Sequence, residues 1–158
     1  MPKESADELR ELAGRESQAM QAAVDAVDEA AARVLGVNRT DLRCLEILIR
    51  DPATPGRLAT ELNLTSGSVT TMLDRLAKLD YIARTPDPDD RRKTLITITE
   101  RARETAWRIY GPIAEEGARE LADFTPTQLR TVLEYLRRSR ELQERHRARI
   151  EQLPKRKR

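Results

Sequence analysis

The 158-residue chain has few of the side chains that an active site usually needs. It contains one cysteine, Cys44, and one histidine, His146. A lone cysteine cannot form an internal disulfide, and one histidine with one cysteine cannot supply a zinc triad or a Cys–His nucleophile pair. The sequence also lacks a glycine-rich phosphate loop of the nucleotide-binding type. We therefore expect no enzymatic activity, no metal site and no cofactor.

Long apolar runs and aromatic residues are also scarce. Aromatics make up 3% of the chain, and no apolar run approaches the roughly 20 residues that span a bilayer. The first residues, Met-Pro-Lys-Glu-Ser, lack the apolar stretch of a secretory signal. We expect a cytoplasmic protein without membrane contact. The 39% of apolar and 35% of charged residues favour a helical protein.

Charge is unevenly distributed along the chain. The formal net charge of +2 does not by itself predict a nucleic-acid partner, but residues 1–36 carry a net −4 and residues 137–158 a net +7. Residues 57–93 are nearly balanced, with seven basic and six acidic side chains. The basic end can bind phosphate nonspecifically or pair with the acidic N-terminal helix, and both interpretations remain open.

Capping residues and apolar spacing predict four helices in the first half of the chain. They cover residues 5–35, 40–50 and 54–62, and a fourth opens at Thr65 or Ser66 after a tight turn at Asn63-Leu64. The side chains expected to face inward are Met20, Ala23, Val24, Val27, Ala30, Ala31, Val34, Leu42, Leu45, Leu48, Ile49, Val69, Met72, Leu73, Leu76 and Leu79.

The pattern then changes from helical to alternating. Residues 82–85 and 94–99 predict two strands, and the proline- and aspartate-rich stretch 86–93 predicts the turn between them. Helices resume at Glu100 and again at Thr125. Gly111-Pro112 is expected to break or bend the first of these two helices. A short helix, a tight turn, a helix and a hairpin predict a mainly α fold with a β-hairpin wing. The expected architecture is a winged helix-turn-helix lobe plus a layer of long helices that cannot bury their apolar faces alone.

The fourth helix offers small polar residues opposite its apolar face. Ser66, Ser68, Thr70, Thr71 and Arg75 lie there, and Gly67 removes one side chain from the approach of a duplex. Unpaired N–H groups of a first turn favour phosphate, and threonine can contact base edges or a thymine methyl group. The alternative is an ordinary solvated first turn rich in Ser and Thr.

The turn of the hairpin carries Arg91, Arg92 and Lys93, which a minor groove can accept. The neighbouring Asp87, Asp89 and Asp90 would oppose simple electrostatic binding, so we expect one or more of them to orient an arginine. A solvated charged loop is the alternative. The position of this turn directly after the fourth helix favours DNA contact over that alternative.

These motifs resemble the multiple antibiotic resistance regulator (MarR) family. The resemblance is carried by Leu58-Ala59, the run from Leu64 to Thr70, Leu73-Asp74-Arg75-Leu76, and the run from Asp87 to Arg92. It implies a homodimer that binds a pseudo-palindromic operator in double-stranded DNA, commonly as a repressor. It also implies one domain over 1–158, with dimerisation helices at 1–36 and 100–153, a DNA-binding lobe at 37–99 and a basic tail at 154–158.

The resemblance also assigns roles to individual residues. Asp90 and Arg92 match the family's wing pair, and Arg75 matches a helix arginine that contacts phosphate or braces the lobe. Asp80 stands where the family usually has glycine, a position suited to left-handed backbone. The DNA-binding set expected here is Thr65, Ser66, Gly67, Ser68, Thr70, Thr71, Arg75, Arg84, Asp90, Arg91, Arg92 and Lys93.

Three questions stay open on the sequence. A small aromatic or anionic effector, as in some relatives, would have Trp107 and Tyr110 as candidate contacts, although packing is the simpler role for both. Cys44 lies among Leu42, Leu45 and Ile47, so we expect a buried thiol rather than a redox sensor. A second function class is a protein-interaction module that uses the winged helix, with the basic tail as a docking peptide.

Overall fold

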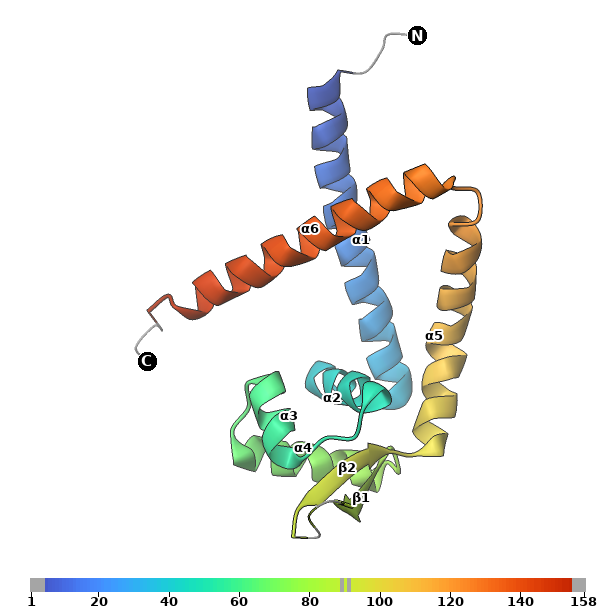
Figure 1. Cartoon of the computed structure of the whole chain (residues 1–158). Coiled ribbons are helices and arrows are strands. Elements are labelled where there is room, and N and C mark those ends of the chain that lie inside the picture. Colours follow the sequence, from blue (N-terminus) through green and yellow to red (C-terminus); the bar gives the residue numbers. More distant parts are fainter. Residues whose placement is uncertain (1–4, 89, 91, 155–158) are drawn as a thin grey trace. The chain divides into compact units, whose positions relative to one another are not determined.

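The structure is a computed structural model that describes residues 5–88, 90 and 92–154. Its elements, in chain order, are α1 (Ala6–Leu35), α2 (Arg39–Arg50), α3 (Pro55–Leu62), α4 (Ser66–Lys78), β1 (Ile82–Pro86), β2 (Thr94–Ile98), α5 (Glu100–Glu120) and α6 (Pro126–Glu151) (Figure 1). The chain forms two compact units, Met1–Ile109 and Tyr110–Arg158. The predicted fold class, mainly helical with a small β-hairpin, is confirmed.

Helix boundaries follow local capping chemistry. The side chains of Ser5, Asn38 and Thr125 each accept a backbone N–H at the third helical position and are answered by a capping-box partner. Thr54 and Thr65 cap α3 and α4 in the same way with their hydroxyl groups. The helix starts expected at Ser5, Thr54, Thr65 and Thr125 are therefore confirmed, whereas α2 begins at Arg39.

Most of the hydrophobic core lies in the winged lobe, residues 37–99, and Leu35 of α1 and Ala102 of α5 join it. Figure 1 shows α2, α3 and α4 grouped together with the hairpin beside them. Leu48, Leu58, Leu76 and Ile96, which come from α2, α3, α4 and β2, are almost completely inaccessible to solvent. Side chains of three helices and one strand thus meet in a single core. This core fixes α4 relative to the wing.

The hairpin is a two-stranded antiparallel sheet. Ile82 pairs with Ile98, Arg84 with Ile96 and Pro86 with Thr94. Ile96 and Ile98 face the core, while the alternate residues of β2 are more exposed. An additional bridge between Ala53 and Ile96 joins the segment before α3 to β2. The strand β2 is therefore held to the lobe by this bridge as well as by its buried side chains.

Two expectations about helices need correction. Ile49, expected to face inward, is 40% exposed, because Leu45 and Leu48 already fill the side of α2 that meets the core. Of the break or bend expected at Gly111-Pro112, the break is wrong, because α5 runs from Glu100 to Glu120 with Pro112 inside it; the bend stays a prediction. A proline removes one backbone hydrogen bond, and a helix of 21 residues retains enough others to continue.

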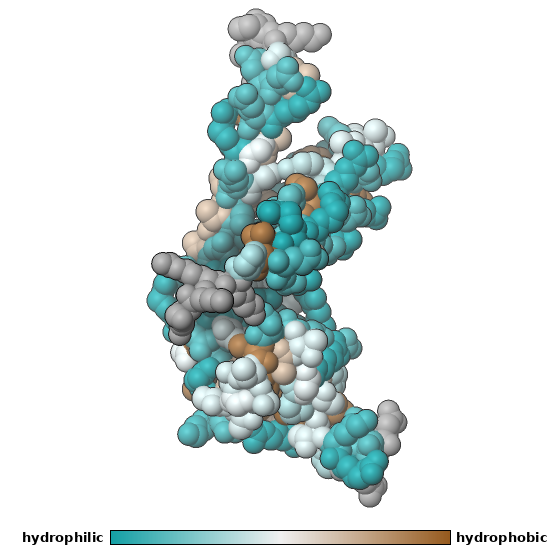
Figure 2. Space-filling model, turned by 90° about the vertical axis from the view of Figure 1, so that its left-hand side faces the viewer, coloured by the Kyte–Doolittle hydropathy of each residue, from teal (hydrophilic) through white to brown (hydrophobic). Residues whose placement is uncertain are grey.

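The long helices leave apolar residues at the surface. In α1 only Ala31 and Leu35 are buried, so the inward face expected around Met20, Val24 and Val34 is exposed in the single chain. In α6 no residue is buried. On the face shown in Figure 2, brown hydrophobic residues stand among the teal hydrophilic ones. Within the described ranges, no helix is both long and apolar enough to cross a membrane.

Candidate nucleic-acid interface

The tight turn between α3 and α4 places the start of α4 at the surface. Asn63 adopts left-handed backbone, with φ 53°, and its N–H donates to the carbonyl oxygens of Ala59 and Thr60. Thr65 then opens α4, whose inner face is held by buried Val69 and Met72. The opposite face begins with exposed residues 65–68. The first turn of α4 is thus open to an external partner.

The hydroxyl groups of this face are engaged with the helix itself. Thr65 Oγ1 lies 2.9 Å from Ser68 Oγ and accepts the Ser68 N–H. The hydroxyls of Thr70 and Thr71 donate to the carbonyl oxygens of Ser66 and Gly67, at 3.0 and 3.1 Å. Because these protons are used within α4, Thr70 and Thr71 present oxygen lone pairs and methyl groups outward.

Arg75 is fixed to a buried carboxylate on another helix. Its Nε donates to Asp41 Oδ2 at 2.8 Å and its Nη2 to Oδ1 at 2.6 Å. Asp41 is 0% exposed and also accepts the Asn38 N–H at 3.0 Å, whereas the Arg75 side chain is 40% exposed. The hydrogen bonds that Arg75 donates to the Asp41 carboxylate raise the pKa of Arg75. The contact is a brace between α2 and α4, one of the two roles that the resemblance implies for Arg75.

Sequence reasoning missed Asp41. The available signal was the spacing Asn38-x-x-Asp41, a reciprocal capping pair at the start of α2. That spacing explains why a carboxylate stands on the inner side of the first turn. It gives no indication of Arg75, which is 34 residues away.

A second ion pair joins α4 to the wing. Arg84 Nη2 on β1 donates to Asp74 Oδ1 at 2.6 Å, and the two side chains are 46% and 51% exposed. Arg84 is one of the expected DNA-binding residues, and Asp74, which sequence reasoning did not single out, partly neutralises it. Exposed pairs of this kind contribute little stability, about 1 kcal/mol at most.

The tip of the wing brings Asp90 and Arg92 together. Asp90 Oδ1 accepts the backbone N–H of Arg92 at 3.2 Å and its Nε at 3.1 Å, while Oδ2 accepts Nη2 at 3.4 Å. These hydrogen bonds from Arg92 lower the pKa of Asp90, so the carboxylate stays charged at neutral pH. The Arg92 side chain is 90% exposed and that of Asp90 only 27%. The arginine is therefore oriented while its outer edge stays free.

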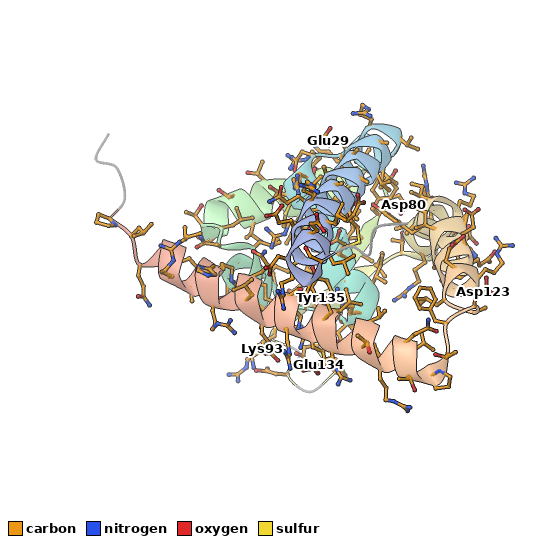
Figure 3. All side chains as sticks on the ribbon, turned by 90° about the horizontal axis from the view of Figure 1, so that it is seen from above. Glu29, Asp80, Lys93, Asp123, Glu134 and Tyr135 are labelled. Carbon is orange, nitrogen blue, oxygen red and sulfur yellow. The ribbon has the colours of Figure 1, made fainter. Side chains whose placement is uncertain are left out.

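Lys93 completes the described part of this turn. Its N–H donates to the Asp90 carbonyl oxygen at 2.8 Å, and its Nζ lies 3.7 Å from Asp90 Oδ2. The side chain projects from the connection between the strands (Figure 3). Arg91, also expected at the interface, and Asp89 lie outside the described residues.

The end of α4 has the unusual backbone that the sequence predicts. Asp80 has φ 57°, the left-handed conformation expected at this position. Its carbonyl oxygen accepts the Thr99 hydroxyl at 2.7 Å, and the neighbouring Tyr81 hydroxyl donates to the Leu35 carbonyl oxygen at 3.1 Å. These bonds tie the segment after α4 to Thr99, just before α5, and to Leu35, the last residue of α1.

The remaining candidates are Cys44, Trp107 and Tyr110. Cys44 is 0% exposed, and burial, with a smaller effect from the Asp41 charge, raises its pKa from 9.0 to about 12. Trp107 on α5 is 64% exposed, so it does not pack into the core of the single chain, and Tyr110 is half-buried. Over the described ranges, no group of three His, Cys, Asp or Glu side chains is arranged to hold a metal ion.

Known proteins are similar to this chain in sequence and in fold. The MarR family model matches residues 35–93. The chain is 31% identical over 125 residues to the uncharacterized HTH-type transcriptional regulator YcgE of Bacillus subtilis, a match covering 78% of this chain and 81% of that protein. The chain belongs to the MarR family.

Solved structures agree with this assignment. The structure of RV1404 from Mycobacterium tuberculosis is 25% identical, with a TM-score of 0.64 over 89% of this chain and 96% of that one. Wild-type MarR from E. coli shares the fold, with 23% identity and a TM-score of 0.54 over 80% of this chain and 94% of that one. The protein is thus a MarR-family transcriptional regulator with a winged helix-turn-helix, and the family match spans α2 to α4, β1 and the turn that follows β1.

Proposed function

We propose that this MarR-family regulator binds a pseudo-palindromic operator in double-stranded DNA as a homodimer and represses transcription. The observation that carries the proposal is the wing tip, where Asp90 orients the 90% exposed guanidinium of Arg92. An oriented cation on a protruding hairpin fits the minor groove, which attracts arginine where it is narrow. Because β2 enters the core at Ile96, the wing has a fixed position relative to α4.

We assign the major groove to the N-terminal half of α4. The exposed residues Ser66, Gly67 and Ser68 allow close backbone approach, and the N–H groups of this turn favour a phosphate. Thr70 and Thr71 present hydroxyl acceptors and methyl groups, which suit the amino groups of adenine or cytosine and the methyl group of thymine. Thr65 supports this surface as the cap of the helix.

The arginines beside α4 have supporting roles in this proposal. Arg75 positions α4 through Asp41, and Arg84 is held by Asp74, so neither guanidinium is fully available to bases. Arg91, Arg92 and Lys93 supply the contacts of the wing. Since residues 57–93 have nearly balanced charge, affinity depends on placed contacts and on two lobes acting together.

Dimerisation is supported by the apolar surface of the long helices. Val34 on α1 is 75% exposed, Ile113 on α5 50% and Ile150 on α6 55%. Helices with an apolar face need a partner to cover it. We propose that a second copy covers these faces. The effector remains a proposal from the resemblance, a small aromatic or anionic molecule with Trp107 and Tyr110 as candidate contacts.

The proposal is tested by selecting bound duplexes from a random DNA library. We expect enrichment of an inverted repeat whose half-sites lie about one helical turn, roughly 10 base pairs, apart or a multiple of it. A control selection with Arg92→Ala should enrich the same core more weakly, because the bases read by α4 are unchanged. Recovery of no sequence preference would contradict operator binding and favour a protein-interaction role for the lobe.

A further inference from the structure

An acidic residue stands on the outermost line of α4. Helical spacing puts Gly67, Thr71, Asp74 and Lys78 on one line along this helix, opposite its buried face. All four residues are exposed. The proposed function turns this line toward the major groove, where the phosphates of both strands repel a carboxylate. Asp74 therefore weakens binding to any duplex unless another group compensates its charge.

The compensating group is Arg84, on the inner face of the wing. Arg84 lies directly across the hairpin from Ile96, and cross-strand partners project from the same face of a sheet. Since Ile96 is buried in the core of the lobe, Arg84 is held on the side of β1 that packs against α4. Its Nη2 donates to Asp74 Oδ1 at 2.6 Å. The pair thus lies between α4 and the base of the wing.

This place matches the position of a DNA strand in the proposed complex. There α4 occupies the major groove and the wing tip the adjacent minor groove, and a sugar–phosphate strand separates the two grooves. The Arg84 side chain is 46% exposed, so its guanidinium can donate to a phosphate of that strand. The Asp74 carboxylate and the phosphate then compete for one cation.

We propose that Asp74 is a specificity-determining residue that makes the phosphate contact of Arg84 depend on base sequence. The inference rests on the proposed operator binding and deepens it. On random DNA, Arg84 binds a phosphate only by leaving Asp74, whose carboxylate is then unpaired in the groove. On the operator, the released carboxylate accepts a hydrogen bond from a cytosine amino group, which aspartate recognises in the major groove. The exchange of partners is therefore favourable only at cognate sites.

Asp74 differs in this respect from Asp90. The Asp90 side chain is 27% exposed and orients an arginine that is 90% exposed, so Arg92 reaches DNA while the pair stays intact. The Asp74 side chain is 51% exposed and stands on the helix assigned to the major groove, so its own carboxylate can meet a base. The wing-tip pair orients a cation, whereas the pair at the base of the wing withholds one.

The first test compares Asp74→Asn with the original protein on operator and on random duplex of equal length. Asparagine keeps the shape of the side chain but releases Arg84. Because an exposed ion pair changes an equilibrium by up to about fivefold, affinity for random DNA should rise about three- to fivefold per docked lobe. The salt slope should steepen by about one per lobe, which indicates one additional phosphate contact. Operator affinity should rise less or fall, so the preference for operator should decrease.

Glu134→Gln is the matched control. Glu134 accepts a hydrogen bond from Arg138 Nε at 2.6 Å in an exposed ion pair on α6, outside the lobe. This variant removes the same charge and releases the same kind of side chain, so it should leave the preference for operator and the salt slope unchanged. Asp74→Glu restores the carboxylate and should bring random-DNA affinity back toward its original value. Equal effects of Asp74→Asn and Glu134→Gln would show an effect of net charge alone and overturn the proposal.

A double-variant cycle tests whether Asp74 acts through Arg84. In an Arg84→Ala background, Asp74→Asn should no longer raise the affinity for random DNA or the salt slope, because the released cation is absent. The same increase in both backgrounds would mean that Asp74 only repels DNA, which contradicts the exchange. Both side chains are exposed and lie outside the core, so the lobe should fold in every variant, and circular dichroism checks this.

The base partner is found by repeating the library selection with Asp74→Asn. We expect the same inverted repeat, with the preference for cytosine relaxed at one position of each half-site. A selected repeat that Asp74→Asn leaves unchanged at every position would overturn this inference alone. If the original protein selects no sequence, operator binding fails as well.

Discussion

Arg75 on α4 and Asp41 on α2 form a bidentate ion pair in which only the arginine reaches solvent. The carboxylate is 0% exposed and the guanidinium side chain 40% exposed. Asp41 also closes the capping box of α2 with Asn38, so one carboxylate starts one helix and holds another. The orientation of α4 therefore depends on a charge buried beneath it.

Arg75→Ala should destabilise the lobe because it leaves a buried carboxylate without its counter-charge. The expected loss is about 2–3 kcal/mol in the free energy of unfolding, below the cost of breaking a fully buried pair because the guanidinium is partly solvated. Urea titration followed by circular dichroism measures it. The double variant Asp41→Leu/Arg75→Met should recover most of the loss, since matched apolar residues replace the pair.

The same double variant tests whether Arg75 only positions α4. If it does, the folded double variant should keep the operator preference and the salt dependence of the original protein. A salt slope smaller by about one per arginine would show that Arg75 also contacts phosphate. That result would contradict a purely bracing role.

Arg92→Ala should weaken operator binding by about ten- to a hundredfold without changing the unfolding midpoint or the dimer. The reason is that Arg92 is 90% exposed and contributes no packing. Arg145→Ala, which removes an exposed arginine from α6, is the charge-matched control and should bind almost normally. Fluorescence anisotropy with labelled operator compares them. Unchanged affinity of Arg92→Ala would remove the wing from the interface.

Asp90→Asn isolates the orienting carboxylate. It keeps the shape of the side chain but loses the charge that holds Arg92. We expect a smaller loss of operator affinity than for Arg92→Ala. The double variant Asp90→Asn/Arg92→Ala should lose no more affinity than Arg92→Ala alone. Additive losses in this cycle would mean that Asp90 acts independently of Arg92.

Truncation after Leu153 removes Pro154 and four basic residues of the tail. We expect a modest loss of affinity that is similar for operator and random DNA, because charges can contact phosphate without reading bases. Gel shifts at two salt concentrations measure the change on both duplexes. The truncation leaves α1, α5 and α6 intact, so the dimer should persist. Loss of the dimer would give the tail a structural role.

Cys44 should be inert in the folded protein. Its thiol is buried and has a pKa of about 12, so the reactive thiolate is almost absent near pH 8. A coloured disulfide reagent should react only after the protein is unfolded in urea. Rapid native reaction accompanied by loss of operator binding would instead indicate a redox sensor.

Features that depend on neighbouring residues could be predicted from the sequence. Helix starts could be predicted at Ser5, Thr65 and Thr125 because capping acts within one turn. Asp90 and Arg92 are two residues apart, so their contact follows from a tight turn. The change from helical spacing to alternation in residues 94–99 similarly located the wing.

Contacts between distant elements could not be predicted in the same way. The Asp41–Arg75 pair spans 34 residues and depends on how α2 packs against α4. Asp74 and Arg84 meet only because β1 turns back past α4. The exposure of Ile49 reflects how wide a face of α2 the lobe covers, which apolar periodicity alone does not determine. Each of these is a property of tertiary packing.

The most direct test of sequence-specific DNA binding is a competition between the DNA upstream of this protein's own gene and random duplex of equal length. The comparison is made from about 50 to 200 mM salt. Affinity for both duplexes should fall steeply with salt, while the preference for the upstream DNA stays large. Equal affinity for the two duplexes throughout the series, or no binding to either, would contradict operator recognition by α4 and the wing.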